Sequence, residues 1–372
     1  MKVLVVGAGF TGASAARVLA DAGHQVVLID HRGKVGGNAS DVYVKGVGYV
    51  SEYGPHLFHT NSDRIWQWLS RFTEWTAYEH RVVSYVSGTM VPMPIIIDTL
   101  NRLFGLSIET PEEMKETLEK MRQPIQNIVT SRDVLLNGVG STIATLLFDG
   151  YTKKQWGVYP SDLDASVIRR IPIRYNNDAR YFTDKYQGQP VNGYTAMFKG
   201  MTEHSHIHFE PRAYEHGEFQ HFDHTIYTGC IDEFHGKVYG PLQYRSLHFK
   251  YNNVLGKMNV FEEIAASSGY VTTNFPMEGS MTRITNYTLL NGMDGPPFLC
   301  SEFPSAEGPP YYPFPNSHNR ARYDMYARLQ ESFPTVHMCG RLGSYAYYNM
   351  DQACSQGIAV AKRLLGEKDA DQ

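Results

Sequence analysis

Three glycines near the start of the chain have the spacing of a phosphate-binding turn. Gly7, Gly9 and Gly12 fit the pattern G-x-G-x-x-G directly after the apolar run 2–6. The first glycine of such a turn permits a tight bend, the second lets the backbone approach a pyrophosphate, and the third lets helix and strand pack closely. Asp30 ends a second apolar run, where its carboxylate can accept both hydroxyls of a ribose. The spacing therefore predicts a dinucleotide-binding site.

Regular elements must position these groups. The runs 2–6 and 25–29 are apolar and rich in β-branched residues, which indicates two buried parallel strands. Residues 13–22 between them are typical of a helix, whose N-terminal N–H groups and positive dipole end would face the phosphates. We therefore expect the cofactor to contact the turn and the residues that follow the second strand: Gly7, Gly9, Phe10, Thr11, Gly12, Asp30, His31, Gly37 and Asn38.

A second pattern narrows the choice of cofactor. Arg32, Gly36 and Gly37 fit R-x-x-x-G-G just after the acidic residue. This extension resembles FAD-binding proteins of the glutathione-reductase and amine-oxidase type more than NAD dehydrogenases. We therefore predict FAD ahead of NAD. The alternative is a dinucleotide fold that has lost its ligand.

A late glycine turn gives a further cofactor signal. The sequence Gly340-Arg341-Leu342-Gly343 follows a short apolar strand, and a closing helix begins near Asp351. In two-domain flavoproteins such a strand, turn and helix bring the C-terminal part of the chain to the isoalloxazine, where free N–H groups can face the flavin pyrimidine carbonyl. We expect cofactor contacts from this segment, at Gly340, Arg341, Asn349, Met350 and Asp351.

Composition excludes several classes of partner. The net charge of −4 means that the chain lacks the overall positive charge that favours binding to nucleic acid or an anionic membrane. The four cysteines form no C-x-x-C pair, and their spacing fits no metal site. We expect no membrane span, and a reduced, cytoplasmic setting is the simplest interpretation. Many of the 25 tyrosines lie in polar, glycine-rich segments rather than in apolar runs, which suits a sugar or nucleotide site.

The pattern along the chain predicts an α/β fold: a Rossmann-like FAD-binding domain with an inserted helical lobe and an antiparallel β-sheet region. At 372 residues the chain exceeds the size at which one core stops growing. We predict a discontinuous FAD-binding domain from residues 1–90, 193–240 and 330–372. Residues 95–150 would form the helical lobe, and 151–192 with 241–325 the sheet and substrate region. Residues 150–184 read as loop-rich.

A series of motifs follows in order along the chain: Gly54-Pro55-His56-Leu57-Phe58-His59-Thr60, Tyr151-Thr152-Lys153-Lys154-Gln155-Trp156-Gly157, Arg170-Ile171-Pro172-Ile173-Arg174, Tyr181-Phe182, Tyr186-Gln187-Gly188, Gly193-Tyr194-Thr195, Tyr227-Thr228-Gly229, Tyr244-Arg245-Ser246-Leu247, Thr282-Arg283-Ile284, Tyr311-Tyr312-Pro313 and the late glycine turn. With these motifs the chain resembles the prokaryotic UDP-galactopyranose mutase family over nearly its whole length. The motif that ends at Trp156-Gly157 is specific to that family.

The resemblance implies an isomerase that interconverts the pyranose and furanose forms of a UDP-sugar without net redox change. It implies that FAD is active when reduced and that flavin N5 acts as the nucleophile on the anomeric carbon of UDP-galactopyranose. It also implies a homodimer and an external reductant such as NAD(P)H. No Ser or Cys nucleophile is then needed.

The resemblance also assigns roles to residues. Arg170 and Arg283 would bind the diphosphate as fixed guanidinium forks, and Arg174 could assist them or form a surface salt bridge. His56 and His59 would lie beside the flavin, where a structural histidine is an equally good interpretation; His56 is the candidate for a catalytic role. The remaining predicted substrate contacts are Tyr151 on the uracil, Trp156 and Glu302 at the sugar, Asn274 at the uridine, Tyr181, Tyr312 and Tyr347 at the phosphates, and Thr152.

Departures from the family pattern leave other functions open. The family usually has a basic residue where this chain has Ala346, Asp where it has Asn349, and charged residues or His where it has Thr285-Asn286-Tyr287. One alternative is the same ring contraction on another nucleotide sugar. Another is a redox flavoenzyme of the amine-oxidase type, which an apolar pocket would favour. A third is a non-catalytic nucleotide-binding protein.

Overall fold

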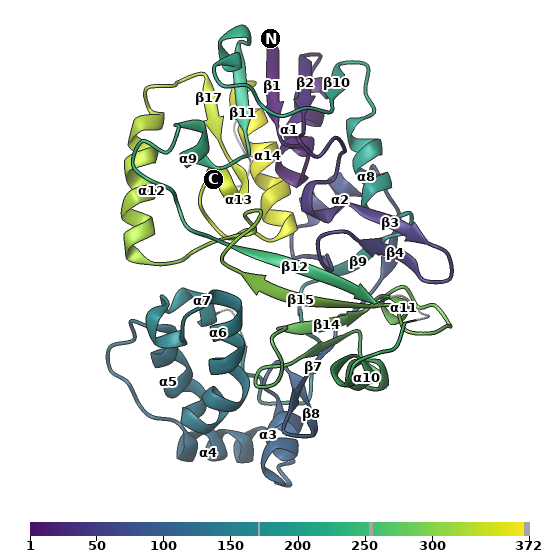
Figure 1. Ribbon diagram of the computed structural model, residues 1–372, viewed down its shortest axis with the longest axis vertical. Helices are drawn as coiled ribbons and strands as arrows, with labels where there is room; N and C mark the ends of the chain where they lie inside the picture. Colours follow the sequence, from purple (N-terminus) through teal and green to yellow (C-terminus); the bar gives the residue numbers. More distant parts are fainter. Residues whose placement is uncertain (170–171, 253–255, 368–372) are drawn as a thin grey trace.

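A five-stranded parallel sheet forms the upper half of the molecule in Figure 1. The computed structural model describes residues 1–169, 172–252 and 256–367. The strand order is β10-β2-β1-β11-β17. Their bounds are β1 Lys2–Val6, β2 Gln25–Ile29, β10 Ile207–Glu210, β11 His224–Tyr227 and β17 Val336–Met338. The two strands predicted at 2–6 and 25–29 are confirmed with these bounds.

The central strand β1 is buried on both faces, which explains its uninterrupted apolar run. Val3 and Val5 pack into the core beneath α1 (Phe10–Asp21) and α14 (Met350–Leu364), whereas Leu4 and Val6 pack on the opposite face. Helix α1 begins at Phe10, three residues before the predicted start, so the prediction is corrected there. A side chain at Gly12 would meet the carbonyl oxygen of Gly7 at 1.8 Å, so this glycine already belongs to the packed first turn of the helix.

A seven-stranded sheet lies below the first and is mainly antiparallel, as predicted (Figure 1). Its order is β16-β12-β15-β14-β13-β7-β8, in which only β13 and β7 pair in parallel among the strands described. The bounds are β7 Val82–Val86, β8 Thr89–Met93, β12 Tyr244–Asn252, β13 Thr272–Asn274, β14 Arg283–Asn286, β15 Leu299–Ser305 and β16 Tyr312–Pro313.

One strand assignment from the sequence needs correction. We assigned residues up to 90 to the FAD-binding domain, but β7 pairs with β13 in the second sheet. The pairing joins segments nearly two hundred residues apart, and alternation within one segment cannot reveal its partner. The division of the chain into domains otherwise stays a proposal.

The helical lobe extends further than the sequence indicated. Its helices are α3 Ile97–Phe104, α4 Pro111–Met121, α5 Ser131–Ile143, a π-helical turn Ala144–Asp149, α6 Gly150–Trp156 and α7 Ser166–Arg169. Leu100, Met114, Leu118 and Leu135 form its buried core. Residues 150–156 were predicted as loop, and the structure corrects this, because α6 continues the helix whose amphipathic pattern the π-turn interrupts.

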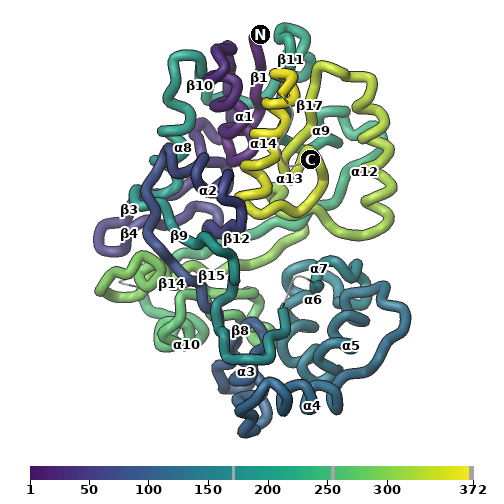
Figure 2. Tube along the Cα trace, turned by 180° about the vertical axis from the view of Figure 1, so that it is seen from behind, coloured from purple at the N-terminus to yellow at the C-terminus, as the bar shows by residue number. Residues whose placement is uncertain are grey.

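Smaller elements connect these layers, as the rear view in Figure 2 also shows. The strands β3 and β4 pair in antiparallel orientation, and Ser62 caps α2. A three-stranded sheet, β5-β9-β6, had no prediction from the sequence. The remaining bounds are β3 Asp41–Val44, β4 Gly48–Ser51, β5 Phe58–Thr60, β6 Trp75–Ala77, β9 Tyr186–Pro190, α2 Asp63–Leu69, α8 Gly193–Thr202, α9 Ile231–Phe234, α10 Val260–Ser267, α11 Tyr287–Leu290, α12 Ser317–Gln330 and α13 Gly340–Gly343.

Candidate functional site

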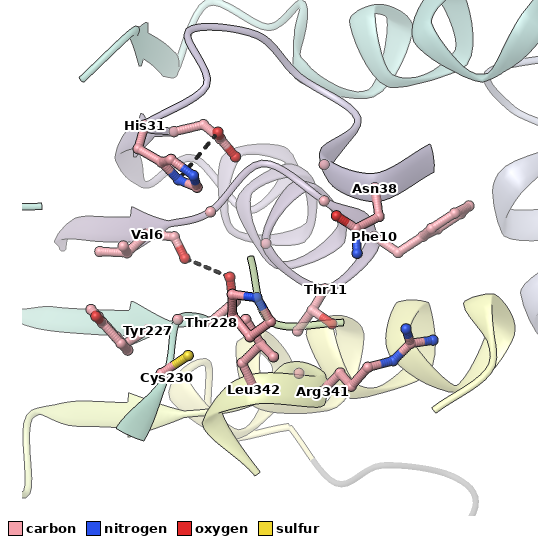
Figure 3. Close-up of a pocket in the computed structure, with 18 of the residues that line it drawn as sticks. Val6, Phe10, Thr11, His31, Asn38, Tyr227, Thr228, Cys230, Arg341 and Leu342 are labelled. Carbon is pink, nitrogen blue, oxygen red and sulfur yellow. Dashed lines mark hydrogen bonds and ion pairs between the residues drawn. The ribbon is translucent and has the colours of Figure 1, made fainter. Parts of the chain in front are cut away.

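A pocket of about 590 Å³ opens where β1, β2 and β11 of the parallel sheet end. Figure 3 shows Phe10 and Thr11 at the start of α1, with Thr228 and Arg341 facing this end of the helix. The pocket brings together most of the predicted cofactor residues: Gly7, Gly9, Phe10, Thr11, Gly12, Asp30, His31, Gly37, Asn38, His56, Gly340, Arg341, Asn349 and Met350.

The glycine turn fits a pyrophosphate. Gly7 has a φ of +97°, and a side chain there would meet Thr228 Oγ1 at 2.1 Å. Gly37 has a φ of +55°, and its Cβ would lie 2.9 Å from Gly9 Cα, so this approach of the two backbones requires glycine at position 37. Gly9 is also the N-cap of α1 and has no side chain to satisfy the first N–H groups of that helix. These groups are available to an anion in the pocket.

Asp30 fits a ribose. Its carboxylate is held in place, because Oδ2 accepts from the Ala8 N–H at 2.9 Å and Oδ1 from the Arg32 N–H at 2.9 Å. The residue is 6% exposed and lines the pocket. Each oxygen keeps a second lone-pair site for a hydroxyl donor. The glycine turn and this carboxylate together fit a bound dinucleotide.

The opposite end of the pocket leads to a group of tyrosines. The Arg341 guanidinium lies 5.3 Å from the ring centroid of Tyr312 and 5.0 Å from that of Tyr347. It donates to the carbonyl oxygens of Tyr311 at 3.2 Å and Tyr348 at 2.7 Å. Arg341 therefore borders both the dinucleotide pocket and the phenol rings beyond it.

His56 is a neutral imidazole at this junction. Burial, together with the positive charges of Arg341 and Arg283, lowers its pKa to about 4. Its Nδ1 lies 2.8 Å from the carbonyl oxygen of Gly54, and since a carbonyl only accepts, Nδ1 carries the proton. Nε2 is then an acceptor on a residue that lines the pocket.

An arginine–glutamate pair forms the centre of a second group of residues. The Nε of Arg283 on β14 donates to Oε1 of Glu302 on β15 at 2.6 Å. The Glu302 side chain is 1% exposed, whereas that of Arg283 is 32% exposed. Burial alone would lower the pKa of Arg283, but the carboxylate of Glu302 raises it well above its ordinary value. The result is a fixed guanidinium with one edge held and part of its surface accessible.

Phenols from distant segments surround this guanidinium. Burial raises the pKa of Tyr151 to about 12, and Arg283, Tyr181, Glu302 and Tyr312 all act on it electrostatically. Burial and Tyr347 likewise raise the pKa of Tyr312. The rings of Tyr312 and Tyr347 stack with centroids 5.9 Å apart, and that of Trp156 lies 6.3 Å from Tyr312. The hydroxyls of Tyr151 and Tyr312 therefore stay protonated and can donate to an anionic ligand.

His80 is a site residue that the sequence analysis missed. It is 5% exposed, and burial followed by the charges of Arg283 and His59 lowers its pKa to about 3. Its Nδ1 lies 2.9 Å from the hydroxyl of Tyr78, and its ring centroid lies 5.7 Å from that of Tyr181. Local spacing gave no signal for His80, because its position depends on the pairing of the next strand, β7, with β13 far along the chain.

The structure places some predicted residues in other surroundings. Arg174 donates to the carbonyl oxygens of Asp178 at 2.8 Å and Tyr181 at 3.4 Å, so it orders the loop that carries Tyr181. His59 Nδ1 lies 3.0 Å from Asp184 Oδ2, and Asp351 accepts from Thr60 Oγ1 at 2.9 Å. Neither His59 nor Asp351 lines the pocket. Arg170 lies outside the described residues.

Other predicted residues lie on the second sheet and on α6. Asn274 on β13 stands opposite Arg283 in the register of β14. Thr152 on α6 is 3% exposed. Asn286, one of the departures from the family pattern, is the N-cap of α11, and Tyr287 beside it is fully buried in the core. This departure therefore serves the fold of the second sheet.

Two absences concern only the part of the chain that the structure describes. There, no helix combines the length and the apolarity that crossing a membrane requires. In residues 1–169, 172–252 and 256–367, no three or more side chains of His, Cys, Asp or Glu gather to hold a metal ion.

The parallel sheet, the glycine turn and the pocket define a Rossmann-like dinucleotide-binding protein, and a family model described as "NAD(P)-binding Rossmann-like domain" matches residues 5–72. A model described as "UDP-galactopyranose mutase" matches residues 146–347. A "Probable UDP-galactopyranose mutase" of Klebsiella pneumoniae is 33% identical over 98% of this chain and 94% of its own length. The chain belongs to the UDP-galactopyranose mutase family, a family of isomerases, and this membership implies a flavin cofactor.

Two further comparisons qualify this result. A "dTDP-fucopyranose mutase" of Escherichia coli is 30% identical over 98% of this chain and 98% of its own length. A solved structure described as "Crystal structure of reduced UDP-Galactopyranose mutase" has a TM-score of 0.76 at 16% identity, and covers 98% of this chain and 94% of that one. The structural match supports the shared fold, whereas the two sequence relatives differ in both nucleotide and sugar.

Proposed function

We propose that this chain is a flavin-dependent isomerase that interconverts UDP-galactopyranose and UDP-galactofuranose. The observation that carries the proposal is the guanidinium of Arg283, held by buried Glu302 and surrounded by Tyr151 and Tyr312. A fixed, permanently charged fork among protonated phenols suits a diphosphate leaving group. An apolar cavity at this place would favour a redox flavoenzyme of the amine-oxidase type, so the charged cluster disfavours that alternative.

The cofactor of the proposal is FAD, active when reduced. Gly7, Gly9 and Gly37 would hold its pyrophosphate and Asp30 its adenosine ribose, while Arg341 with Asn349 and Met350 would border the isoalloxazine. When bound and reduced, this group supplies N5 as the nucleophile for the anomeric carbon. His56, neutral and with its proton on Nδ1, offers Nε2 to a donor in the pocket.

Residues of the second group would bind the substrate. Arg283, together with Arg170, would neutralise charge on the diphosphate as the bond to the sugar breaks. Tyr181, Tyr312 and Tyr347 would donate to phosphate oxygens. The other assignments are Tyr151, Thr152 and Asn274 for the uridine and Trp156 with Glu302 for the sugar, and Arg174 would act by holding the loop of Tyr181.

The proposal includes the surroundings of the enzyme. We propose a cytoplasmic homodimer whose flavin is reduced by an external donor such as NAD(P)H. The same chemistry on a dTDP-sugar is the second candidate, and the 30% identity to a dTDP-fucopyranose mutase over nearly the whole chain favours keeping it.

The test compares oxidised with dithionite-reduced protein. Each is incubated with UDP-galactofuranose and, separately, with dTDP-fucofuranose, and the pyranose products are separated by chromatography. We expect conversion of the UDP-sugar by the reduced protein only. Equal turnover in both redox states contradicts a role for reduced flavin, and faster conversion of the dTDP-sugar replaces the first candidate by the second.

A further inference from the structure

Lys154 of α6 contacts a loop that belongs to another layer of the molecule. Its Nζ donates to the carbonyl oxygens of Phe275 at 2.6 Å, Glu278 at 2.6 Å and Met281 at 3.3 Å. These three carbonyls come from the loop between β13 and β14. An ammonium group has three donors, so one side chain satisfies three main-chain acceptors of this loop.

The helix and the loop touch at a second point. A side chain at Gly150, the first residue of α6, would meet the carbonyl oxygen of Pro276 at 2.2 Å. Only glycine permits this approach. Gly150 and Lys154 lie one turn apart on α6, so the helix contacts the loop along one face.

The two elements carry different residues of the proposed nucleotide site. Tyr151, Thr152 and Trp156 lie on α6, interleaved with Gly150 and Lys154. The loop is bounded by Asn274 at the end of β13 and Arg283 at the start of β14. A shift of the helix against the loop therefore changes the distance between the uracil-stacking and diphosphate-binding groups.

The Lys154 ammonium group is partly removed from water, so its charge depends on the carbonyl oxygens of the loop. Burial lowers the pKa of Lys154 to about 8, while the Glu278 carboxylate opposes this shift. The charge is thus compensated by carbonyl dipoles of the loop together with one nearby carboxylate. The preceding residue of the helix, Lys153, is exposed, and its Nζ lies 4.9 Å from the Tyr159 ring centroid.

We propose that Lys154 is a positioning residue, which fixes the nucleotide-contacting helix α6 against the β13–β14 loop and thereby sets the affinity for the nucleoside diphosphate. The inference rests on the proposed function. Groups that bind substrate and transition state alike affect KM, so loosening them raises KM more than it lowers kcat. Lys154 does not line the dinucleotide pocket, so flavin binding is unaffected.

The test uses flavin-loaded wild type, Lys154→Met, Lys154→Gln and the control Lys153→Met. UDP is titrated into the oxidised proteins and followed by tryptophan fluorescence, and KM and kcat for UDP-galactofuranose are measured after reduction. We expect the UDP Kd and the KM of Lys154→Met to rise about tenfold, with kcat within about threefold of wild type. Lys154→Gln, which keeps two donors, should be intermediate, and Lys153→Met should match wild type within about twofold.

The outcomes separate the inference from the proposed function. A wild type that neither binds UDP nor converts the sugar overturns both. If the wild type binds UDP and converts the sugar, but Lys154→Met or Lys154→Gln binds UDP equally well, the positioning role alone is overturned. An unchanged KM with a reduced kcat also contradicts it. If Lys154→Met yields no folded protein, Lys154→Gln decides by the same criteria.

Discussion

The dinucleotide pocket and the Arg283 group are built in different ways. The phosphate- and ribose-binding part of the pocket is made largely of main chain: the glycines at 7, 9 and 37 and the start of α1, together with the carboxylate of Asp30, all within the first forty residues. The Arg283 group is made of side chains from α6, β14, β15, β16 and the loop around 181. A backbone site needs a fixed spacing along the chain, whereas a side-chain site needs only a fixed arrangement in space.

The two regions also hold negative charge differently. The pocket offers N–H groups at a helix start, without a formal charge on the turn itself. The second region offers a guanidinium whose charge is partly compensated by a carboxylate that is 1% exposed. The difference predicts that changes in one region remove the flavin, and that changes in the other remove turnover while the flavin stays.

The largest expected effect is that of Gly9→Val. The nearest atom to a Cβ at Gly9 is Gly37 Cα at 3.7 Å, so the protein itself tolerates the added carbon, but a valine side chain fills the space of the pyrophosphate. We expect folded protein without flavin and without turnover. The check is the flavin absorbance per protein together with the far-ultraviolet circular dichroism.

A matched control for this variant is Gly200→Ala in α8, where the nearest atom to the new Cβ is Phe72 O at 3.6 Å. It should keep a normal flavin content. Normal flavin content in Gly9→Val would show that the pocket has been assigned to the wrong ligand.

Arg283→Ala should have the next largest effect. A well-placed donor to charge that develops in the transition state is worth roughly 2.7–4 kcal/mol, so we expect kcat to fall roughly 10²- to 10³-fold with flavin retained. Arg283→Lys keeps a cation beside Glu302 but lacks the planar fork. Compared with Arg283→Ala, it should therefore restore more of the lost stability than of the lost activity.

Arg320→Ala is the control for this pair, because Arg320 is 65% exposed in its side chain and pairs with Asp324 within α12. It should be fully active. A folded, flavin-loaded Arg283→Ala with wild-type kcat would remove the residue from the site.

The contrast between the regions also explains what the sequence could predict. The turn at Gly7–Gly12, the strands beside it and Asp30 follow from local spacing, and the structure places them as expected. His80 could not be found in this way, because its position depends on β7 pairing with β13 far along the chain. Helix α6 was missed because a π-helical turn shifts the periodicity before Gly150. For the side-chain site, only the family resemblance connected the residues.

His80 makes folding stability depend on pH. Its pKa of about 3 in the folded state lies below its ordinary value of 6.5. The unfolded chain therefore binds a proton that the folded protein does not, and the free energy of unfolding falls as pH falls from about 6.5 toward 3. Between pH 7 and pH 5, the free energy of unfolding measured with urea should therefore fall for both proteins by different amounts. We expect the fall to be about 1–2 kcal/mol smaller for His80→Gln than for wild type.

The control for this prediction is His208→Gln, since the His208 side chain is 76% exposed. Its pH dependence should follow that of wild type. If His80→Gln also follows wild type, His80 is not kept neutral by burial in the folded protein.

The smallest expected effect is that of Thr285→Val, at one of the departures from the family pattern. Thr285 is fully buried, and its hydroxyl has no hydrogen-bond partner among the described residues. Replacing an unpaired buried hydroxyl with a methyl of the same shape is neutral or stabilising. We expect a thermal midpoint equal to or above wild type and kcat/KM within about twofold. A tenfold loss would move this position from the fold into substrate recognition.

We infer that the Arg283 group, rather than the dinucleotide pocket, binds the nucleoside diphosphate. A calorimetric titration of UDP into flavin-loaded wild type and Arg283→Ala, each with and without excess FAD, tests this inference. We expect UDP to bind wild type equally well in both conditions, and Arg283→Ala to bind it at least about tenfold more weakly with its flavin intact. UDP binding that excess FAD abolishes, and that Arg283→Ala leaves unchanged, would instead place the nucleotide in the dinucleotide pocket.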